Sequence, residues 1–440
     1  MTQTTPVDTG SLLLRFPDPL PSASHHAPQA GGRTPRGIHV PLFAARCSLP
    51  SLFLCATVVL LGGCATGPRI REPMRAVWVT RGDYRAPEDV TRIMDNCAQL
   101  GFNTVLFQVR GNGTAFYKSS FEPWADELGG QDPGWDPLAL AIAEAHARQL
   151  DLHAWVNVMP AWRGTKPPTN PEQLYNKRPQ WFWYDQNGQR QALSDFYVSL
   201  NPCREDVRLY LVGVFEEIAR NYDIDGLHLD YIRFPNEPPA TPRGSGLDYP
   251  YDDETLKAYR LATGKAPQDD KEAWNQWRTQ QITRLVAEIH AMLRRTRPQA
   301  PLSAAAGSVR ERARAHFQDA RAWVDQGVID VLFLMNYTDD PEEFSRRIDP
   351  WLEGESKAVV VPGAWFGRHP GKSPEDAAAA VRTQLETAVE KTGNLCLFSY
   401  GALFARGETI DTIGETDAAK TRAARRAAIR ACLGELAAVR

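Results

Sequence analysis

The sequence predicts an α/β fold, a (β/α)8 TIM barrel in which eight parallel strands alternate with helices. The first supporting observation is that, from residue 74 onward, short runs rich in β-branched and aromatic residues alternate with amphipathic stretches. The second is that no G-x-G-x-x-G turn follows the first run, as a dinucleotide-binding open sheet would require. A doubly wound open sheet is therefore the less favoured architecture.

The strands are expected at the eight β-rich runs, which share an apolar centre and lie at residues 75–80, 103–110, 152–158, 223–235, 302–307, 330–337, 357–363 and 394–400. Residues typical of helix ends lie between them. A helical stretch that begins near Glu88 ends at Gly101, because glycine readily adopts the left-handed conformation of a helix C-terminus. The pairs Asp136-Pro137 and Asn201-Pro202 each have the form of an N-cap followed by a first helical proline.

Two long proline-rich segments, residues 160–200 and 235–252, follow the third and fourth runs. We expect them to be long loop insertions of one barrel rather than linkers between domains.

The N-terminal region has the features of a bacterial lipoprotein signal. The apolar run from Leu49 to Leu61 is too short to span a bilayer and has the length of a signal-peptide core. Leu61-Gly62-Gly63-Cys64 resembles the lipobox, in which the cysteine becomes the lipid-bearing first residue. We expect residues 1–63 to be a disordered extension plus signal peptide, 64–73 a linker and 74–440 the barrel. The alternative is a short transmembrane or core helix.

A lipid on Cys64 would place the protein in the bacterial cell envelope. Ala65 follows the cysteine where an aspartate would retain a lipoprotein in the inner membrane, so we expect the outer membrane, facing the periplasm.

Charge and cysteine content argue against several other partners. The net charge of -3 gives no basic field for nucleic acid. The seven cysteines form no C-x-x-C pair, no H-E-x-x-H occurs, and the nine histidines lack ligand spacing, so no metal or other cofactor is expected.

The fourth run, "DIDGLHLDYIRFP", carries polar residues where a buried strand should be apolar. Side chains alternate along a strand, so His228 and Asp230 share one face with Gly226 while the intervening leucines share the other. The leucines suit the surrounding helices, which points His228 and Asp230 into the barrel. Asp230 lies at the carboxyl end of the strand, where barrel enzymes place reactive groups, whereas Asp225 lies at the opposite end.

The same alternation directs further residues of the first three runs inward, where we expect them to bind substrate: Trp78, Gln108, Arg110, Trp155 and Asn157. His153 also points inward but lies deep in its run, and there it is expected to fill the barrel.

Hydrolysis of a glycosidic bond usually needs a second carboxylate. Asp83 follows the first run, and Glu122 follows the second beside Phe121 and Trp124, an apolar setting that raises a carboxyl pKa. The sequence does not choose between Glu122 and Asp83. Other acids in the loops are Asp126, Asp195, Asp339 and Asp340, and Asp340 has the form of an N-cap.

Aromatic residues are frequent in the predicted loops, and pyranose rings stack on such side chains. They include Trp124, Trp162, "WFWYD" at 181–185, Tyr231, Tyr337 and Trp365. Packing against the top of the barrel is the alternative for each of them singly.

Several motifs together resemble the glycosyl-hydrolase-like family 10 over residues 74–400. They are "RAVWVT", "NTVLFQVRGNGTAFYKSSFEPWAD", "DPLALAIAEAHARQLDLHAWVN", "SLNPCREDVRLY", "YDIDGLHLDYIRFP" and "DVLFLMNYT". The resemblance implies a (β/α)8 barrel, often secreted or lipid-anchored in bacteria, and Asp230 matches the acid that ends the family's fourth strand. It also resembles the nucleophile site of the α-amylase superfamily, where a cation takes the place of His228.

One divisome-associated branch of that family acts on peptidoglycan glycan strands stripped of their peptides. That branch has two consecutive acids after the fourth strand and a "PQ-Y" pattern in the sixth, where this chain has Asp230-Tyr231 and "LMNY".

The sequence thus predicts a glycoside hydrolase of the cell envelope with a polysaccharide substrate, peptidoglycan glycan first. Asp230 is expected to be the nucleophile or base, and Glu122 or Asp83 its partner. The sugar would be held by Arg110, Gln108, Asn157, Trp155, His228, Tyr231, Tyr337, Trp78 and Trp124. The alternatives are a catalytically inactive carbohydrate-binding lipoprotein and a lytic transglycosylase.

Overall fold

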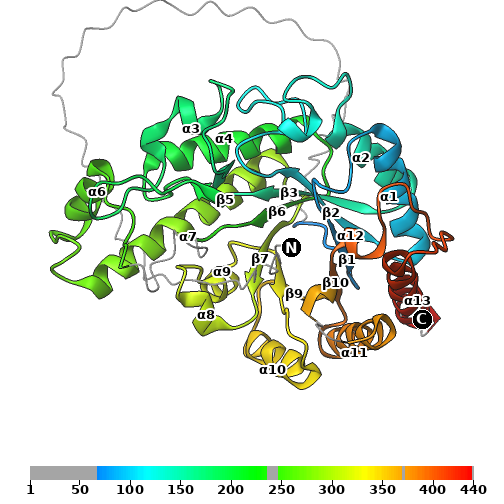
Figure 1. Cartoon of the computed structure of the whole chain (residues 1–440). Helices are drawn as coiled ribbons and strands as arrows, with labels where there is room; N and C mark the ends of the chain where they lie inside the picture. Colours follow the sequence, from blue (N-terminus) through cyan, green and yellow to red (C-terminus); the bar gives the residue numbers. More distant parts are fainter. Residues whose placement is uncertain (1–66, 235–245, 369–371, 439–440) are drawn as a thin grey trace, which may run out of the picture. The chain divides into compact units, whose positions relative to one another are not determined.

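The computed structural model describes residues 67–234, 246–368 and 372–438. Eight parallel strands form a closed barrel in the order β1-β10-β9-β8-β7-β6-β3-β2, which confirms the predicted TIM barrel (Figure 1). The barrel strands are β1 (Arg75–Val79), β2 (Thr104–Arg110), β3 (Asp151–Asn157), β6 (Gly226–Asp230), β7 (Leu302–Gly307), β8 (Val331–Met335), β9 (Val359–Trp365) and β10 (Leu395–Phe398).

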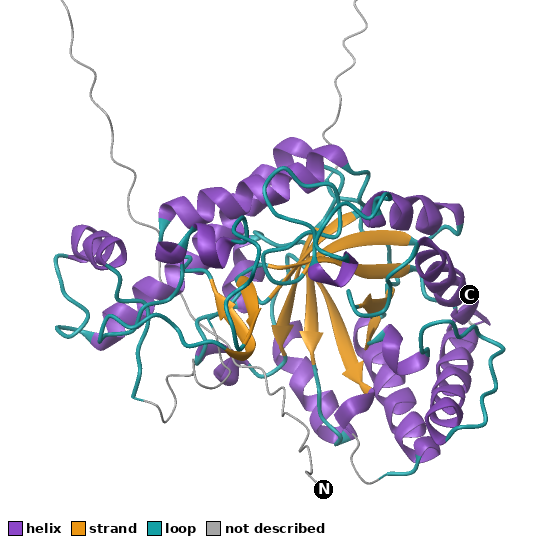
Figure 2. Ribbon diagram, turned by 45° about the horizontal axis from the view of Figure 1, so that its top comes forward, coloured by secondary structure: helices purple, strands orange, loops and turns teal. Residues whose placement is uncertain are grey.

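Helices surround the strands on the outside (Figure 2). They are α1 (Pro87–Leu100), α2 (Pro137–Ala147), α4 (Glu205–Asn221), α7 (Lys271–Thr296), α8 (Arg310–Arg314), α9 (Ala320–Gln326), α10 (Pro341–Leu352), α11 (Pro374–Thr392), α12 (Tyr400–Leu403) and α13 (Asp417–Ala438).

Two of the predicted helix starts are confirmed, and one is wrong. Asp136 accepts a hydrogen bond from Ala139 N, and Asp340 accepts from the amides of Glu342 and Glu343, so both cap a helix. Asn201 does not cap α4, which begins three residues after Pro202. Its amide instead donates to Asp252 Oδ2 at 2.7 Å and to Thr255 Oγ1 at 2.8 Å, and so fixes the loop against another helix.

The barrel has an outer and an inner apolar layer, as the alternation along β6 predicts. Leu227 and Leu229 belong to the large core between strands and helices. A second cluster fills the inside of the barrel and contains Met74, Ala76, Trp78, Leu106, Trp155, Val331, Phe333, Val361 and Cys396. His228, on the inner face of β6, is completely buried, and Phe333 of this cluster packs against its ring at 5.1 Å.

The two insertions contain secondary structure of their own. Residues 160–200 include the antiparallel pair β4 (Pro160–Gly164) and β5 (Ser194–Ser199), with the short helix α3 (Leu174–Lys177) between them. The second insertion leads to α6 (Asp253–Thr263). Short 3-10 turns occur at Asp126–Leu128, Pro179–Trp181 and Phe366–Arg368.

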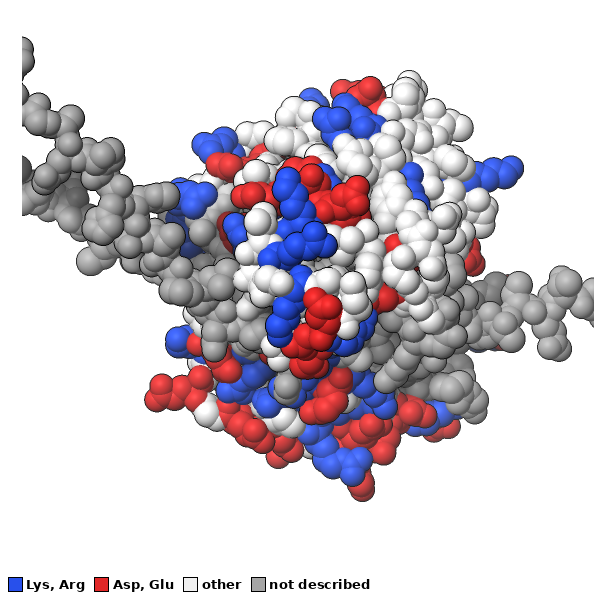
Figure 3. All heavy atoms as spheres, turned by 90° about the vertical axis from the view of Figure 1, so that its left-hand side faces the viewer, with Lys and Arg blue, Asp and Glu red and all other residues white. Residues whose placement is uncertain are grey.

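The predicted extension and signal peptide (1–63), and the lipidation site Cys64, lie outside the described residues. Among the residues that are described, no helix is both long and apolar enough to cross a bilayer. On the face shown in Figure 3, basic and acidic side chains are intermixed, and neither sign covers it continuously.

Candidate active site

A cleft of about 430 Å³ opens where the barrel strands end. It is lined by residues from all eight barrel strands, from the loops that follow them and from the hairpin of β4 and β5. The lining residues are Trp78, Thr80, Arg81, Gly82, Gln108, Glu127, Trp155, Asn157, Arg163, Tyr197, Asp230, Tyr231, Arg233, Ala305, Met335, Tyr337, Trp365 and Phe398.

Asp230 lies in this cleft, at the carboxyl end of β6 and beside Asn157 of β3 in the strand register. Its side chain accepts a 2.6 Å hydrogen bond from Tyr231 N, and Arg233 Nη1 lies 3.6 Å from its Oδ1. Burial raises the pKa of the Asp230 carboxyl above its ordinary value, although the Arg233 guanidinium and the Tyr231 amide oppose this. A carboxyl in this setting keeps its proton to a higher pH than an exposed aspartate does.

Polar side chains of β2 and β3 form a hydrogen-bonded wall next to Asp230. Gln108 Nε2 and Trp155 Nε1 both donate to Asn157 Oδ1, each at 3.1 Å. Asn157 in turn donates to Gly111 O, and Gln108 accepts from Arg81 N at 3.0 Å. Because every partner is held by another, this wall keeps its shape without a ligand.

Aromatic rings also line the cleft. Tyr337 packs against Trp365 and Phe398, with ring centroids 5.4 and 5.8 Å away. Tyr231 meets Tyr197 of β5 edge-to-face at 5.2 Å. These flat apolar faces beside hydrogen-bonding groups suit the two sides of a sugar ring.

His228 does not line the cleft, although the sequence analysis expected it to bind substrate. Its Nε2 accepts a 3.2 Å hydrogen bond from Trp78 Nε1, so the ring proton is on Nδ1, which faces Ser303 Oγ at 3.0 Å. Burial lowers the pKa of His228 well below its ordinary value and keeps the ring neutral. The imidazole therefore supports Trp78 beneath the floor of the cleft.

Arg110 and Glu122 also lie away from the cleft, contrary to expectation. The register between β2 and β3 shifts between Gln108 and Arg110, so the side-chain alternation that places Gln108 inward fails two residues later. Arg110 forms a fully buried ion pair with Glu122, at 2.7 Å from Nη2 to Oε1.

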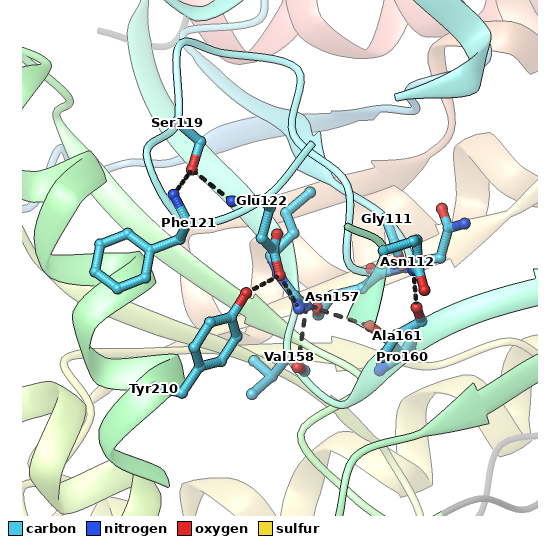
Figure 4. Close-up of polar contacts among 12 residues, drawn as sticks. Gly111, Asn112, Ser119, Phe121, Glu122, Asn157, Val158, Pro160, Ala161 and Tyr210 are labelled. Atoms are coloured by element: carbon cyan, nitrogen blue, oxygen red, sulfur yellow. Dashed lines mark hydrogen bonds and ion pairs between the residues drawn. The ribbon is translucent and has the colours of Figure 1, made fainter. Parts of the chain in front are cut away.

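The surroundings of Glu122 complete this buried network (Figure 4). Tyr210 donates to Glu122 Oε1 at 3.2 Å, while Arg110 also donates to the carbonyl oxygens of Asn157 and Val158. Glu122 thus joins the loop after β2 to α4 and, through Arg110, to the end of β3. This is a structural arrangement, and it leaves no face of the carboxylate open to a substrate.

Asp83 and Trp124 are likewise absent from the cleft lining. Asp83 Oδ2 accepts from Thr80 N at 2.7 Å and from Thr80 Oγ1 at 2.9 Å, and burial raises its pKa to about 6. Its hydrogen bonds hold the turn whose residues Thr80 and Gly82 do line the cleft. Asp83 therefore shapes the rim without facing the cavity.

The second carboxylate in the described lining of the cleft is Glu127, which was not predicted from the sequence. Glu127 lies in the 3-10 turn after β2 and accepts a 2.8 Å hydrogen bond from Arg81 Nε. Arg81, Arg163, Tyr197 and Arg233 were not predicted from the sequence either, and all of them come from loops or from the inserted hairpin. Strand alternation carries no information about such positions, and only the acid-rich "ADELGG" after the second run could have drawn attention to Glu127.

Within the described residues, no cluster of histidine, cysteine and carboxylate side chains has the size needed to hold a metal ion.

Comparison with solved structures agrees with the barrel. The catalytic domain of β-amylase from Paenibacillus polymyxa superposes with a TM-score of 0.53 at 10% identity, over 75% of this chain and 93% of that one. Alpha-L-fucosidase isoenzyme 2 from Paenibacillus thiaminolyticus gives a TM-score of 0.53 at 14% identity, over 80% of this chain and 48% of that one. At such identities the likeness shows the fold alone.

Proteins that are similar in sequence give more specific information than these solved structures do. Glycosyl hydrolase DigH of Escherichia coli (strain K12) is 28% identical, and the match covers 61% of this chain and 66% of that protein. Glycosyl hydrolase YngK of Bacillus subtilis (strain 168) is 25% identical, over 64% of this chain and 58% of that protein. The chain thus spans slightly less than two thirds of the length of these relatives. The family model described as Glycosyl hydrolase-like 10 matches residues 73–364, and the chain, a glycoside hydrolase-like TIM barrel, belongs to that family.

Proposed function

We propose that this protein is a glycoside hydrolase that cleaves a polysaccharide with two carboxylates, Asp230 and Glu127. The observation that carries the proposal is that these two acids line one cleft, at the carboxyl ends of the barrel strands, together with polar and aromatic side chains. Glycosidic hydrolysis needs one carboxyl group as an acid and a second as a nucleophile or base. Glu127 takes the place that the sequence analysis gave to Glu122 or Asp83.

The chemistry of these side chains supports a sugar substrate. Gln108 and Asn157 offer amide groups to hydroxyls, and Trp78, Trp155, Tyr231 and Tyr337 offer apolar faces to the ring. Peptidoglycan glycan strands are the first candidate, because the relatives named above are glycosyl hydrolases and the N-terminal sequence resembles a lipoprotein signal. In this proposal Cys64 carries a lipid that anchors the protein in the bacterial outer membrane, with the barrel in the periplasm.

The proposal is tested by incubating the purified protein, without residues 1–64, with glycan strands stripped of their peptides and with a panel of other polysaccharides. New reducing ends are expected from the wild type. Asp230→Asn and Glu127→Gln should each lower the rate by at least about a hundredfold, the usual contribution of acid–base catalysis. The matched controls are Asp225→Asn, at the other end of β6, and Asp126→Asn, beside Glu127, and both should retain the wild-type rate.

Azide rescue assigns the two roles. In a variant that lacks the nucleophile, azide attacks the sugar instead and forms a glycosyl azide of inverted configuration. In a variant that lacks the acid, a substrate with an activated leaving group restores the rate, because that group departs without being protonated. If the wild type and all variants bind glycans but produce no new reducing ends, the protein is a carbohydrate-binding protein without activity. If the products carry anhydro-sugar ends, it is a lytic transglycosylase. Either result overturns the proposed hydrolysis.

A further inference from the structure

Among the residues that the structure describes, the cleft is lined by more positive than negative side chains. Three arginines line it, Arg81, Arg163 and Arg233, against the two carboxylates Asp230 and Glu127. Arg81 is paired with Glu127 at 2.8 Å, and Arg233 lies 3.6 Å from Asp230. Arg163 has no acidic partner among the described residues, so one positive charge is left over.

Arg163 is held in place by neutral groups. It lies opposite Tyr197 in the antiparallel register of β4 and β5, and its guanidinium carbon is 5.7 Å from the centre of the Tyr197 ring. Its Nε donates to the carbonyl oxygen of Asp195 at 2.8 Å. The two Nη groups therefore remain as a planar pair of donors, which is the geometry that matches the two oxygens of a carboxylate.

Arg233 supplies an independent observation. The residue is 6% exposed, yet its Nε makes no hydrogen bond within the described part of the chain, and Nη1 lies 3.6 Å from Asp230 Oδ1, beyond the usual hydrogen-bond distance. Buried donors without acceptors are rare in folded proteins because they lose the water that would otherwise bind them. Arg233 Cζ lies 4.3 Å from the centre of the Tyr231 ring, so the guanidinium stacks on that ring while Nη1 faces Asp230 and Nε is left without an acceptor among the described residues.

We propose that the cleft recognises an acidic glycan, and that Arg163 binds a carboxylate on a sugar next to the bond that is cleaved, with Arg233 as the second cation of this subsite. The inference rests on the proposed function, since it names the class of polysaccharide that the same cleft accepts. A singly charged carboxylate balances the single surplus charge. A doubly charged phosphate monoester would carry more negative charge than this surplus, and the carboxylates Asp230 and Glu127 would repel it.

The test measures binding without turnover, in an Asp230→Asn background. Isothermal titration calorimetry compares three acidic glycans, namely peptide-free peptidoglycan strands, polygalacturonate and alginate, with the same polymers after reduction of their carboxyl groups to alcohols. At least one acidic glycan should bind at least about tenfold more tightly than its reduced form, since guanidinium–carboxylate contacts change affinity by about ten- to a hundredfold. The preference should weaken as salt is raised.

Arg163→Gln should abolish the preference, and Arg163→Lys, which keeps the charge but not the planar pair of donors, should retain part of it. The control is Arg295→Gln, which changes an exposed arginine of α7 that does not line the cleft. This variant should prefer acidic over reduced glycans as strongly as the Asp230→Asn protein does. Equal affinity for acidic and reduced polymers, no binding of any acidic polymer, or an unchanged preference in Arg163→Gln would each overturn the inference. Acid-selective binding by a protein that cleaves nothing would overturn only the proposed function.

Discussion

Glu122 and Glu127 are five residues apart, and each binds an arginine, yet their surroundings give them different tasks. Glu122 is completely enclosed with Arg110, while Glu127 keeps about a quarter of its side chain exposed beside Arg81. A pattern of residue types cannot distinguish these cases, because the distinction depends on which side of the loop faces the barrel mouth. The apolar neighbours of Glu122, which suggested an acid with a raised pKa, instead belong to a buried junction.

Substitution should separate the two glutamates. Glu122→Ala is expected to lower the free energy of unfolding by about 3–5 kcal/mol, because it leaves the buried Arg110 charge unpaired. Glu127→Ala, which breaks a partly exposed ion pair, should cost about 1 kcal/mol or less but should abolish turnover. Urea denaturation and the reducing-end assay check both variants. Comparable stability of the two proteins would contradict the structural role of Glu122.

Asp83 gives a pH dependence whose sign follows from its burial. In the unfolded chain its carboxyl ionises near pH 3.8, and in the folded protein its pKa is raised to about 6. Between these values the folded state binds more protons, so the contribution of Asp83 to stability falls as the pH rises from about 4 to about 6. The difference is worth about 3 kcal/mol.

Asp83→Asn keeps an acceptor for Thr80 and removes the titration. Relative to the wild type, this variant should therefore be more stable at pH 7 than at pH 4, by up to about 3 kcal/mol, when unfolding is followed in denaturant at each pH. The exposed neighbour substitution Gly82→Ser provides a control that changes no ionisable group. Parallel pH curves for wild type and Asp83→Asn would show that burial does not perturb this carboxyl.

At the scale of single elements, the alternation of side chains along a strand predicted the cleft residues correctly wherever the strand pairing is regular. On β6 and β3 it placed Asp230, Trp155 and Asn157 at the cleft. On β2 it succeeded for Gln108 and failed for Arg110, because the register shifts between them. The segment that contains β4 and β5 was predicted as a long insertion, and the hairpin within it was not, because its two strands pair across about thirty residues and no local pattern reveals such pairing.

Gly226 shows how closely β6 and β3 approach inside the barrel. A Cβ at this position would lie 2.6 Å from the His153 ring. Gly226→Ala is therefore expected to lower the free energy of unfolding by about 1–3 kcal/mol through overpacking. Gly434→Ala is the matched control, because nothing lies within 4 Å of its Cβ and alanine favours the helix, so that variant should be slightly more stable than the wild type. Thermal unfolding of both variants decides the point, and equal melting temperatures would exclude the predicted clash.

At the scale of the whole molecule, the barrel could be predicted because eight strand–helix alternations are a global pattern that survives local errors. The wrong cap at Asn201 changed no strand order. The cleft was less predictable, since Arg81, Glu127, Arg163 and Tyr197 reach it from segments outside the barrel strands. Sequence periodicity describes strands and helices, whereas the substrate is met largely by the connections between them.

The first described residues bear on the proposed lipid anchor. Arg69 N donates to Gln299 O at 2.8 Å, and Arg71 Nη1 donates to Gln149 O at 2.6 Å. Gln299 and Gln149 precede β7 and β3, so this segment binds at the end of the barrel where strands begin, opposite the cleft. Changes upstream of Arg69 should therefore leave the cleft intact.

We expect Cys64→Ser in the full chain to prevent incorporation of labelled palmitate in a bacterial host and to move the protein from the membrane fraction to the soluble fraction. The lipid is attached through the sulfur of the cysteine thiol, and the serine hydroxyl of the variant does not replace that thiol. The rate on soluble glycan oligosaccharides should equal that of the wild type, because the cleft lies at the other end of the barrel. Palmitate labelling that persists in Cys64→Ser would refute the anchor at this residue, and a slower soluble reaction would show that the N-terminal segment contributes to the cleft.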